Sequence, residues 1–453
     1  MTQLNTRAEK KQFYMLVVSL VLPMAAQNLI NVAVTSADVI MLGKVGETVL
    51  SASSLAGQVL FILTLVLFGL TSGAAVLTAQ YWGKKDIGAI EKVLGISMRI
   101  ALIVAAVFTV AVMAFPRQIM YLFTSEEPVI AEGIAYLRIV GFSYVFIGIT
   151  VVYLNIMRSV ERVIISTVVY LVSLCVNVVL NAIFIFGLLG FPAMGIKGAA
   201  LATLIARITE FVIVVIYAGK MNRQVCLRIK NIFVRDKMMM RDFCLYAVPV
   251  LLNEMMWGLG ISTVTAIIGH MGSTMVAGNS VAQVVRQLAM VVTFGVSNAT
   301  AIIIGKAIGE GKEDYARVYS KRLIRLSIVV GILGAGLILL ISPIVKANLT
   351  LTAQAQSYLE MMLVVMAFYV MFQSYNCPMI VGVFRAGGDT RFGLLVDVGS
   401  LWAVSIVFGA LAAFVWKLPP TIVYIILTCD EAVKIPLSFW RYHTYKWIKN
   451  ITR

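Results

Sequence analysis

The sequence predicts an all-α polytopic membrane protein: twelve transmembrane helices in two six-helix lobes, related by a pseudo-two-fold axis along the membrane normal. Three observations carry this prediction. The 453 residues are 60% hydrophobic and only 13% charged, with a mean hydropathy of +0.95. The chain contains apolar stretches of roughly 20 residues or more, the length that crosses a bilayer. Its second half also repeats the first.

The repeat is an ungapped offset of 226 residues, which places Pro23 on Pro249 and Gly83 on Gly309. Other matching pairs are Gly43 with Gly269, Gly46 with Gly272, Thr48 with Thr274, Phe68 with Phe294, and Arg99 with Arg325. The offset holds over roughly 75 residues of ordinary apolar composition, so chance is a poor explanation. Each half has six expected helices, an even number, so both halves enter the membrane in the same direction.

The first expected helix follows a short basic segment and continues to about Ile40. This run is too long for a signal-peptide core and no small-residue cleavage site follows it, so we expect a retained helix. In order, the helices are expected near residues 14–41, 48–79, 93–115, 130–154, 163–187, 197–218, 243–268, 273–304, 323–343, 355–383, 393–416 and 419–440. The domains are then an N-lobe (1–218), a charged linker along the cytoplasmic surface (219–242) and a C-lobe (243–453).

The net charge of +16 is distributed in alternate loops. Basic residues concentrate at 10–11, 84–85, 158–162, 220–241, 306–325, 385–391 and 441–453. The intervening loops contain few, namely Lys44, Arg117, Lys197, Lys346 and Lys417. By the positive-inside rule both termini are cytoplasmic, and we expect an integral protein of a bacterial plasma membrane. The basic excess therefore reflects topology, and we expect no nucleic-acid partner.

The sequence shows no signal for a cofactor or for enzyme chemistry. Its five cysteines have no CxxC spacing and its two histidines, His270 and His443, are far apart, so neither a disulfide framework nor a structural metal site is expected. Phosphate-binding loops and embedded nucleophile constellations are missing as well. Energy for any transport must come from an ion gradient or from the gradient of the substrate.

Polar residues inside expected spans are the candidate site residues, because ionisable groups there are costly. In the first helix Gln27, Asn31, Thr35 and Asp38 follow one another at spacings of four, four and three, on one face. Asp38 lies ~36 Å along a helix that starts near Tyr14, which is the outer part of the membrane. The alternative is an interfacial carboxylate that caps a loop.

Glu254 in the seventh helix lies only ~18 Å from the cytoplasmic start, near the midplane, where a short side chain cannot reach water. Pro249, five residues earlier, leaves the Leu245 carbonyl free and permits a kink. This arrangement suits cation binding and gating. The alternative is a structural ion pair, with Arg286 as the candidate partner.

Further polar positions are less specific. Asn177 and Asn181 lie four apart on the fifth helix and Thr203 lies in the sixth, where such residues also simply bind helices together. For Asp397 the sequence favours a structural role. The remaining substrate-cavity candidates are Trp257, Gln283, Arg286, Gln287, Tyr369, Gln373, Ser374 and Asn376. The 23 methionines and the aromatic side chains would suit bulky amphiphilic cargo.

Several motifs together resemble the multidrug and toxic compound extrusion (MATE) family over almost the full length. In the first helix the motif is Pro23 to Asp38 followed by Gly43-x-x-Gly46. The others are the segments PVLLNEMMWGLG, FGVSNATAIIIGKAIGEGK and FRAGGDTRF, and the two matching helix ends at which a glycine precedes charged residues, Gly83-Lys84-Lys85-Asp86 and Gly309-Glu310-Gly311-Lys312. The resemblance implies an antiporter that moves organic, often cationic, compounds outward, driven by Na⁺ or H⁺. It also implies small organic substrates and the lipid bilayer as partners, and we expect a monomer.

The resemblance also implies roles for individual residues. Asp38 belongs to an N-lobe network with Asn177, Asn181 and Thr203, and Glu254 is the acid of a C-lobe cation site. Some family members add an aspartate in the tenth helix, and by spacing from Arg385 the matching position in this chain is near Ser374. The C-lobe is therefore expected to have a lone carboxylate.

Two other classes of transporter remain as alternatives. A flippase for lipid-linked precursors has similar lobes and would need extra helices or a strongly cationic cavity, for which Arg286 and Arg207 are weak support. A major-facilitator transporter also has six plus six helices. Its loop between the second and third helices usually reads G-x-x-x-D-R/K-x-G-R/K, whereas this loop reads YWGKKDIGAIEK.

Overall fold

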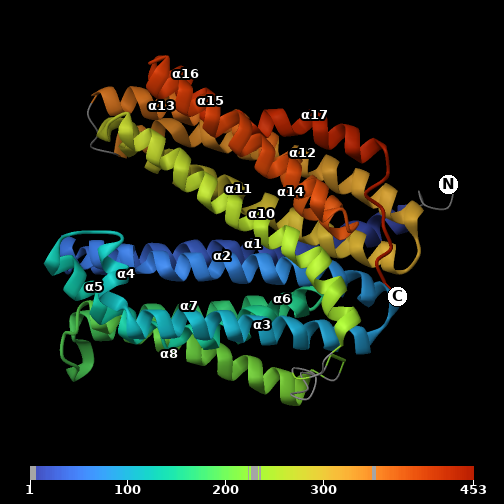
Figure 1. Ribbon diagram of the computed structural model, residues 1–453, viewed down its shortest axis with the longest axis horizontal. Helices are drawn as coiled ribbons and strands as arrows, with labels where there is room; N and C mark the ends of the chain where they lie inside the picture. The colour runs from blue at the N-terminus through green and yellow to red at the C-terminus, as the bar shows by residue number, and fades with distance from the viewer. Residues whose placement is uncertain (1–6, 223, 226–232, 234–235, 349–352, 453) are drawn as a thin grey trace. The chain divides into compact units, whose positions relative to one another are not determined.

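The structure is a computed structural model that describes residues 7–222, 224–225, 233, 236–348 and 353–452. These residues form helices and contain no β-strand, as Figure 1 shows in chain order. The apolar composition explains this, because a backbone segment in lipid must satisfy its hydrogen bonds within itself. The predicted all-α polytopic membrane protein is therefore confirmed.

The first half contains five long helices and one bent pair. The long helices are α1 (Arg7–Gly43), α2 (Glu47–Lys84), α3 (Ile87–Ala114), α7 (Val163–Phe186) and α8 (Ile196–Ile216). Between α3 and α7 lie the short α4 (Pro116–Tyr121), then α5 (Glu127–Val140) and α6 (Ser143–Ser159), which meet at an angle of 53°. A 3₁₀ turn (Leu188–Gly190) follows α7, and a π-helical turn (Tyr217–Met221) ends α8.

The boundaries of these helices follow their capping residues. Asp86 caps α3 by accepting a hydrogen bond from the Ala89 amide at 2.9 Å. Pro116 begins α4, where its missing N–H costs nothing. Gly187 ends α7 in the left-handed conformation with φ 71°, which glycine adopts without strain.

The second half contains α10 (Lys237–His270), α11 (Ser273–Gly309), α12 (Glu313–Asn348) and α13 (Ala353–Cys377). It continues with the π-helical segment η4 (Pro378–Phe384), α14 (Thr390–Gly399), η5 (Ser400–Ile406), α15 (Val407–Ala410), η6 (Leu411–Val415), α16 (Pro420–Leu427) and α17 (Asp430–His443). Pro378 cannot donate a backbone hydrogen bond, which accounts for the wider turn that begins there.

Ten helices, or eleven with the bent α5–α6 pair, are long and apolar enough to cross a membrane within the described residues. The expected span 130–154 is this bent pair. The last expected span, 419–440, is broken into α16 and α17 at Thr428 and Cys429. Its second part contains Asp430, Glu431 and Lys434, which no simple apolar span would tolerate without partners.

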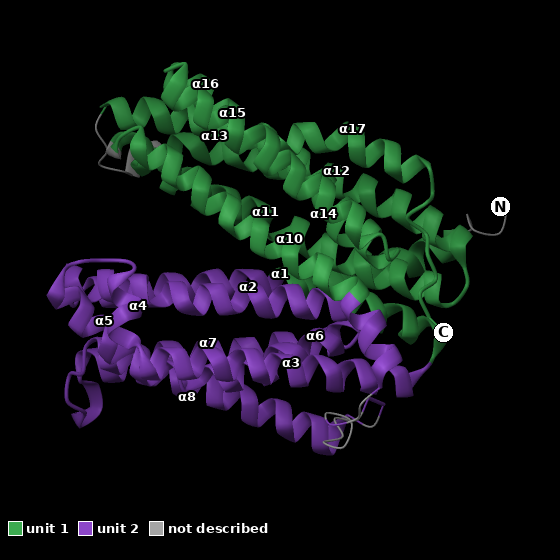
Figure 2. Ribbon diagram, in the orientation of Figure 1, with its two compact units in different colours: residues 1–25, 75–85, 245–453 green, residues 26–74, 86–244 purple. Residues whose placement is uncertain are grey.

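Contacts divide the chain into two compact units (Figure 2). Unit 1 comprises residues 1–25, 75–85 and 245–453, and unit 2 comprises 26–74 and 86–244. Unit 1 thus contains the expected C-lobe from residue 245 onward, together with parts of α1 and α2. The lobe boundaries at 218 and 243 follow the sequence repeat and stay a prediction. The expected linker 219–242 lies partly outside the described residues, at 223, 226–232 and 234–235.

Within unit 1 the repeat has a direct structural counterpart at the ends of α2 and α11. A Cβ atom on Gly83 would collide with the Lys306 carbonyl, and a Cβ atom on its repeat mate Gly309 would collide with the Gln80 carbonyl. Gly305 likewise lies where a Cβ would be 2.7 Å from Cβ of Ala79. The two helices therefore touch backbone to backbone at repeat-related positions.

Candidate functional site

A cavity of about 140 Å³ lies within unit 2 and is lined mainly by α1, α7 and α8. Its wall consists of Ile30, Asn31, Val34, Thr35, Asp38, Leu60, Tyr136, Tyr170, Ser173, Asn177, Thr203, Ala206, Arg207 and Glu210. Because a water molecule occupies about 30 Å³, this volume accommodates an ion with a few waters. Drug-sized ligands need several hundred Å³.

Asp38 enters this cavity half-buried from α1 and is held by an asparagine pair on α7. Nδ2 of Asn181 donates to Oδ1 of Asp38 at 2.5 Å and to Oδ1 of Asn177 at 3.1 Å. Nδ2 of Asn177 reaches Oγ1 of Thr203 at 3.5 Å. The structure therefore brings together the four residues expected to form the N-lobe network, and their part in ion coupling stays a prediction.

The same network leaves one strong acceptor unused. Asn181 is 0% exposed, and among the described residues its Oδ1 has no hydrogen-bond partner. A buried amide oxygen without a donor is costly, and an amide oxygen is a good ligand for a hard cation. Asp38 and Asn181 thus offer a carboxylate and a free carbonyl oxygen on neighbouring helices.

Two charged residues of α8 also line the cavity: Arg207, which the sequence analysis named only as weak support for a flippase, and Glu210, which it did not name. Nη1 of Arg207 pairs with Oε1 of Glu210 at 2.7 Å, and Glu210 is 2% exposed. Thr203, Arg207 and Glu210 lie four and three residues apart, which places them on one helical face. In the sequence, that spacing was the signal that could have grouped Arg207 and Glu210 with Thr203. With all groups ionised, two carboxylates and one guanidinium leave the cavity with one excess negative charge.

The other candidates on α1 separate into two groups. Asn31 and Thr35 line the cavity. Gln27 does not, because its amide nitrogen donates to Ser166 at 2.9 Å and to Thr167 at 2.8 Å, and its oxygen accepts from Arg158. Gln27 is 2% exposed and joins α1 to α6 and α7, so its position is that of a structural cross-link.

Glu254 in unit 1 forms an ion pair with an arginine. Its Oε1 accepts from Nη2 of Arg385 at 2.6 Å, and the two side chains are 12% and 4% exposed. The partner lies 131 residues away, just after η4. The alternative of a structural ion pair is therefore realised for Glu254, with Arg385 in the place expected for Arg286.

Arg286 instead lies among neutral groups. Its Nε donates to Gln283 at 2.8 Å, its Nη1 donates to Gln373 at 3.0 Å, and its guanidinium lies 5.8 Å from the ring centre of Tyr369. Trp257 packs against the apolar core of unit 1, and Gln287 is exposed. None of these C-lobe candidates lines the cavity of unit 2.

The two remaining candidates, both on α13, are buried, and each is hydrogen-bonded to a neighbouring residue. Ser374 shares a hydrogen bond of 3.0 Å with Thr293. Nδ2 of Asn376 donates to the Glu431 backbone oxygen at 2.6 Å and to Glu431 Oε2 at 2.9 Å. Both residues are at most 1% exposed, so neither faces open space.

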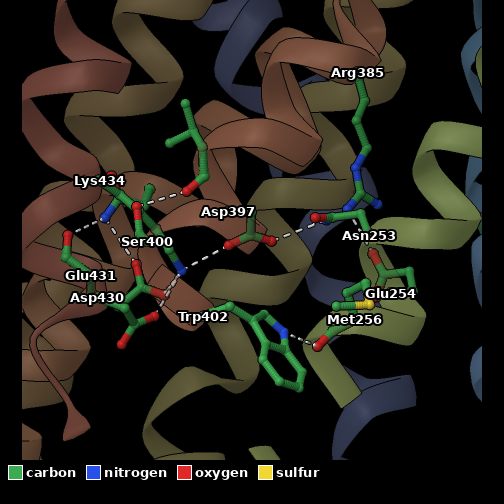
Figure 3. A network of polar contacts seen from close by, with 12 residues as sticks. Asn253, Glu254, Met256, Arg385, Asp397, Ser400, Trp402, Asp430, Glu431 and Lys434 are labelled. Atoms are coloured by element: carbon green, nitrogen blue, oxygen red, sulfur yellow. Dashed lines mark hydrogen bonds and ion pairs between the residues drawn. The ribbon is translucent and has the colours of Figure 1, made fainter. Parts of the chain in front are cut away.

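A second cluster of buried charges lies in unit 1 around Lys434 (Figure 3). Nζ of Lys434 lies 2.7 Å from Asp397, 2.9 Å from Asp430 and 3.0 Å from Glu431. Asp397, for which the sequence favoured a structural role, thus pairs with a cation. The sequence analysis did not single out the other three, although Asp430, Glu431 and Lys434 have the i, i+3 and i+4 spacing of helical ion pairs.

These helices, long and apolar and with polar and charged side chains enclosed among them, define an all-α integral membrane protein. The sequence model of the MatE family matches residues 23–183 and 249–411, more than half of the chain, so this protein belongs to the MatE family of transporters. The two matched segments begin 226 residues apart, the offset of the internal repeat.

Named relatives and solved structures agree with this assignment. The chain is 25% identical over 399 residues to the probable multidrug resistance protein YoeA of Bacillus subtilis (strain 168), covering 87% of this chain and 85% of the relative. A structure described as the outward-facing conformation of a multidrug resistance MATE family transporter has a TM-score of 0.86 at 18% identity, covering 97% and 96%. A MATE crystal structure in the bent conformation also has a TM-score of 0.86, over 95% of each chain.

Proposed function

We propose that this protein is an antiporter that exports organic, cationic or amphiphilic compounds and is driven by Na⁺ or H⁺. Family membership and the multidrug resistance names of its relatives support the efflux part of the proposal. The observation that carries the coupling part is that Asp38 lines a small cavity and accepts a hydrogen bond from Asn181, whose buried amide oxygen has no partner among the described residues.

The physical basis is competition for one carboxylate. A buried Asp38 can be neutralised by a proton or by a metal cation, but not by both at once. The cavity is too small for a drug-sized molecule, so we assign it to the coupling ion rather than to the substrate. Each charge that moves inward across 100 mV supplies about 2.3 kcal/mol, which can drive outward movement of cargo.

The charges around the cavity favour this function over a flippase for lipid-linked precursors. Such precursors are anionic and would need an excess of positive charge in the site. Arg207, which offered weak support for a flippase, is paired with Glu210 at 2.7 Å. Asp38 then leaves the cavity net negative, which attracts a cation.

Transport in proteoliposomes with independently imposed Na⁺ and proton gradients tests the proposal. We expect dye efflux from the parent protein to follow one of the two gradients. Asp38→Asn should reduce this coupled efflux at least tenfold without reducing membrane insertion. Glu47→Gln, an exposed acid at the start of α2, is the matched control and should transport like the parent. Coupled efflux by Asp38→Asn at the parental rate would contradict the proposal.

The same proposal includes the setting of the protein. We propose a monomer in a bacterial plasma membrane, with both termini in the cytoplasm and the bilayer and small organic molecules as its partners. The alternation of basic loops supports this orientation. A reporter that fluoresces only in the cytoplasm, fused after the C-terminus, should be bright, whereas a reporter active only outside should be silent.

A further inference from the structure

We propose that Lys434 is a built-in cation: its ammonium occupies the cation position of the Asp397–Asp430–Glu431 cage and keeps free Na⁺ out of this half of the protein. Only the consequence of this proposal rests on the proposed ion-coupled transport: if Lys434 fills the cage, Asp38 is the acid that binds the coupling ion. The geometric claim about the cage stands apart from transport.

The ammonium of Lys434 is saturated by the cage. A lysine has three N–H donors, and three carboxylate oxygens lie at 2.7, 2.9 and 3.0 Å from this Nζ. The side chain is 1% exposed, and the three acids are 14%, 4% and 5% exposed. A compact charge surrounded by hard oxygens has the surroundings of a bound metal cation.

Two buried amides hold the far oxygens of two of these carboxylates. Nδ2 of Asn253 donates to Asp397 Oδ2 at 3.0 Å, and Nδ2 of Asn376 donates to Glu431 Oε2 at 2.9 Å. Among the described residues, the Oδ1 atoms of both asparagines have no hydrogen-bond partner, although the residues are 3% and 1% exposed. Without the lysine, three carboxylates would be left with no cation, beside two buried amides.

The carboxylates outnumber the ammonium, so the cage as a whole attracts positive charge. The neighbouring Glu254–Arg385 pair is neutral and leaves this excess unchanged. A second cation bound to these carboxylates would lie close to the ammonium, and the two like charges would repel each other. The tethered charge is always present at its site, whereas Na⁺ must be bound from solution.

A merely structural lysine and a built-in cation respond differently when the side chain is removed. If Lys434 only joins α14 to α17, Lys434→Ala is destabilised equally in every salt. If it substitutes for a bound cation, its loss opens a site that Na⁺ can fill, and Na⁺ then stabilises the folded state by mass action.

The experiment measures unfolding temperature of the full-length protein in detergent, in NaCl, KCl and choline chloride at equal ionic strength and fixed pH. Asp38→Asn is the background, so that the cavity of unit 2 does not contribute. With Lys434 intact, we expect no Na⁺-specific shift. Adding Lys434→Ala should lower the unfolding temperature in choline chloride and create a Na⁺-specific increase of several degrees.

Two further variants locate the effect. Asp397→Asn, added to the lysine variant, should abolish the Na⁺-specific shift because it removes one oxygen charge from the cage. Lys446→Ala, at an exposed position of the C-terminal segment, should show no Na⁺ response and controls for loss of a positive charge. If folded Lys434→Ala protein can be purified only in buffers that contain NaCl, that result supports the proposal, because Na⁺ then replaces the missing ammonium.

Three outcomes would overturn the proposal. One is a Na⁺-specific shift in the protein with Lys434 intact that disappears on Asp397→Asn. The second is equal destabilisation of Lys434→Ala in all three salts, and the third is failure to recover that variant in any of them. None of these readouts depends on transport, so loss of coupled efflux in Asp38→Asn is judged separately.

Discussion

Glu254 and Arg385 are each tolerable inside the bilayer because the other is there. Their side chains are nearly inaccessible, and the carboxylate and guanidinium lie 2.6 Å apart. Taking a single charge out of water costs several kcal/mol. A buried ion pair is therefore tolerated, whereas either charge buried without the other strongly destabilises the fold. At the scale of the residue, this pairing connects α10 to the segment after η4, and a part for Glu254 in cation exchange stays a prediction.

This pairing predicts a strongly non-additive mutant cycle. Arg385→Met should destabilise the protein by about 3–5 kcal/mol, because it leaves the Glu254 carboxylate buried without its cation. The double variant Glu254→Gln/Arg385→Met should recover most of that loss. Denaturant unfolding in detergent measures the cycle, with the exposed Arg391→Met as control. Additive losses in the double variant would show that the two side chains are not coupled.

At the scale of the element, the contact of α2 with α11 depends on glycines that repeat at the 226-residue offset. Gly83 and Gly309 let the two backbones approach each other where any side chain would collide with a carbonyl oxygen. Small residues at helix contacts are the usual route to close packing in membranes. The duplication therefore preserved a packing surface, although the charged residues of the two halves differ.

Gly309→Ala is predicted to disrupt this contact. Its Cβ would meet the backbone of Gln80, which cannot rotate away, so we expect a loss of at least 1–3 kcal/mol, the range for overpacking. Gly336→Ala in α12 is the matched control, because nothing lies within 4 Å of its would-be Cβ. It should be neutral or stabilising by up to about 1 kcal/mol. Equal unfolding temperatures for the two variants would contradict the packing argument.

The start of α10 supplies a prediction with a defined pH dependence. Asp236 accepts hydrogen bonds from the Met239 and Met238 amides at 2.9 and 3.1 Å and from Lys92 at 3.0 Å. The Met239 amide, followed by Lys92, lowers the pKa of Asp236 below its usual value of 3.8. The folded protein therefore favours the charged form of Asp236. The stability that this carboxylate contributes is fully present above its usual pKa and is lost as the pH falls through the lowered pKa of the folded state.

Asp236→Ala should lower stability at neutral pH by roughly 1 kcal/mol, the typical loss of an N-cap, with little added by the exposed ion pair. The difference from the parent should shrink as the pH falls below the usual pKa of the aspartate. Asp236→Asn keeps a capping oxygen and should lose less. Unfolding temperatures measured across a pH series decide this, and a difference that does not change with pH would contradict the capping role of the charge.

At the scale of the whole molecule, the C-terminal segment connects distant parts of unit 1. Trp447 is 0% exposed, and its backbone lies against Gly387. Gln80, from α2, donates to the carbonyls of Ala386 and Lys449 at 2.7 and 3.1 Å and accepts from the Ile451 amide at 2.9 Å. One glutamine therefore joins segments more than 300 residues apart in the chain.

Trp447→Ala should destabilise the protein by about 3–5 kcal/mol, because it removes a fully buried aromatic side chain. Truncation after His443 should do at least the same. Trp440→Ala is the control, since Trp440 is 59% exposed on α17. Thermal unfolding of the purified proteins provides the measurement, and a truncated protein as stable as the parent would show that the segment contributes nothing to the fold.

The sequence by itself determined the features that depend on local pattern. Long apolar stretches predicted the helices, and the 226-residue offset predicted the duplication, because both follow from residue spacing alone. The resemblance grouped Asp38 with Asn177, Asn181 and Thr203, and the structure brings these side chains together. The break at Thr428 and Cys429 and the bend between α5 and α6 were missed, because an apolar run does not reveal where a helix is interrupted.

Only the tertiary structure decided the partners of the buried charges. Arg385 rather than Arg286 meets Glu254, and Lys434 meets Asp397 from another helix, because charge pairing depends on which helix faces pack together. An acid in a span signals a cost, but not whether a distant arginine, a lysine or an ion from solution offsets it. The packing of α10, α13, α14 and α17 makes that choice, and no spacing along the chain encodes it.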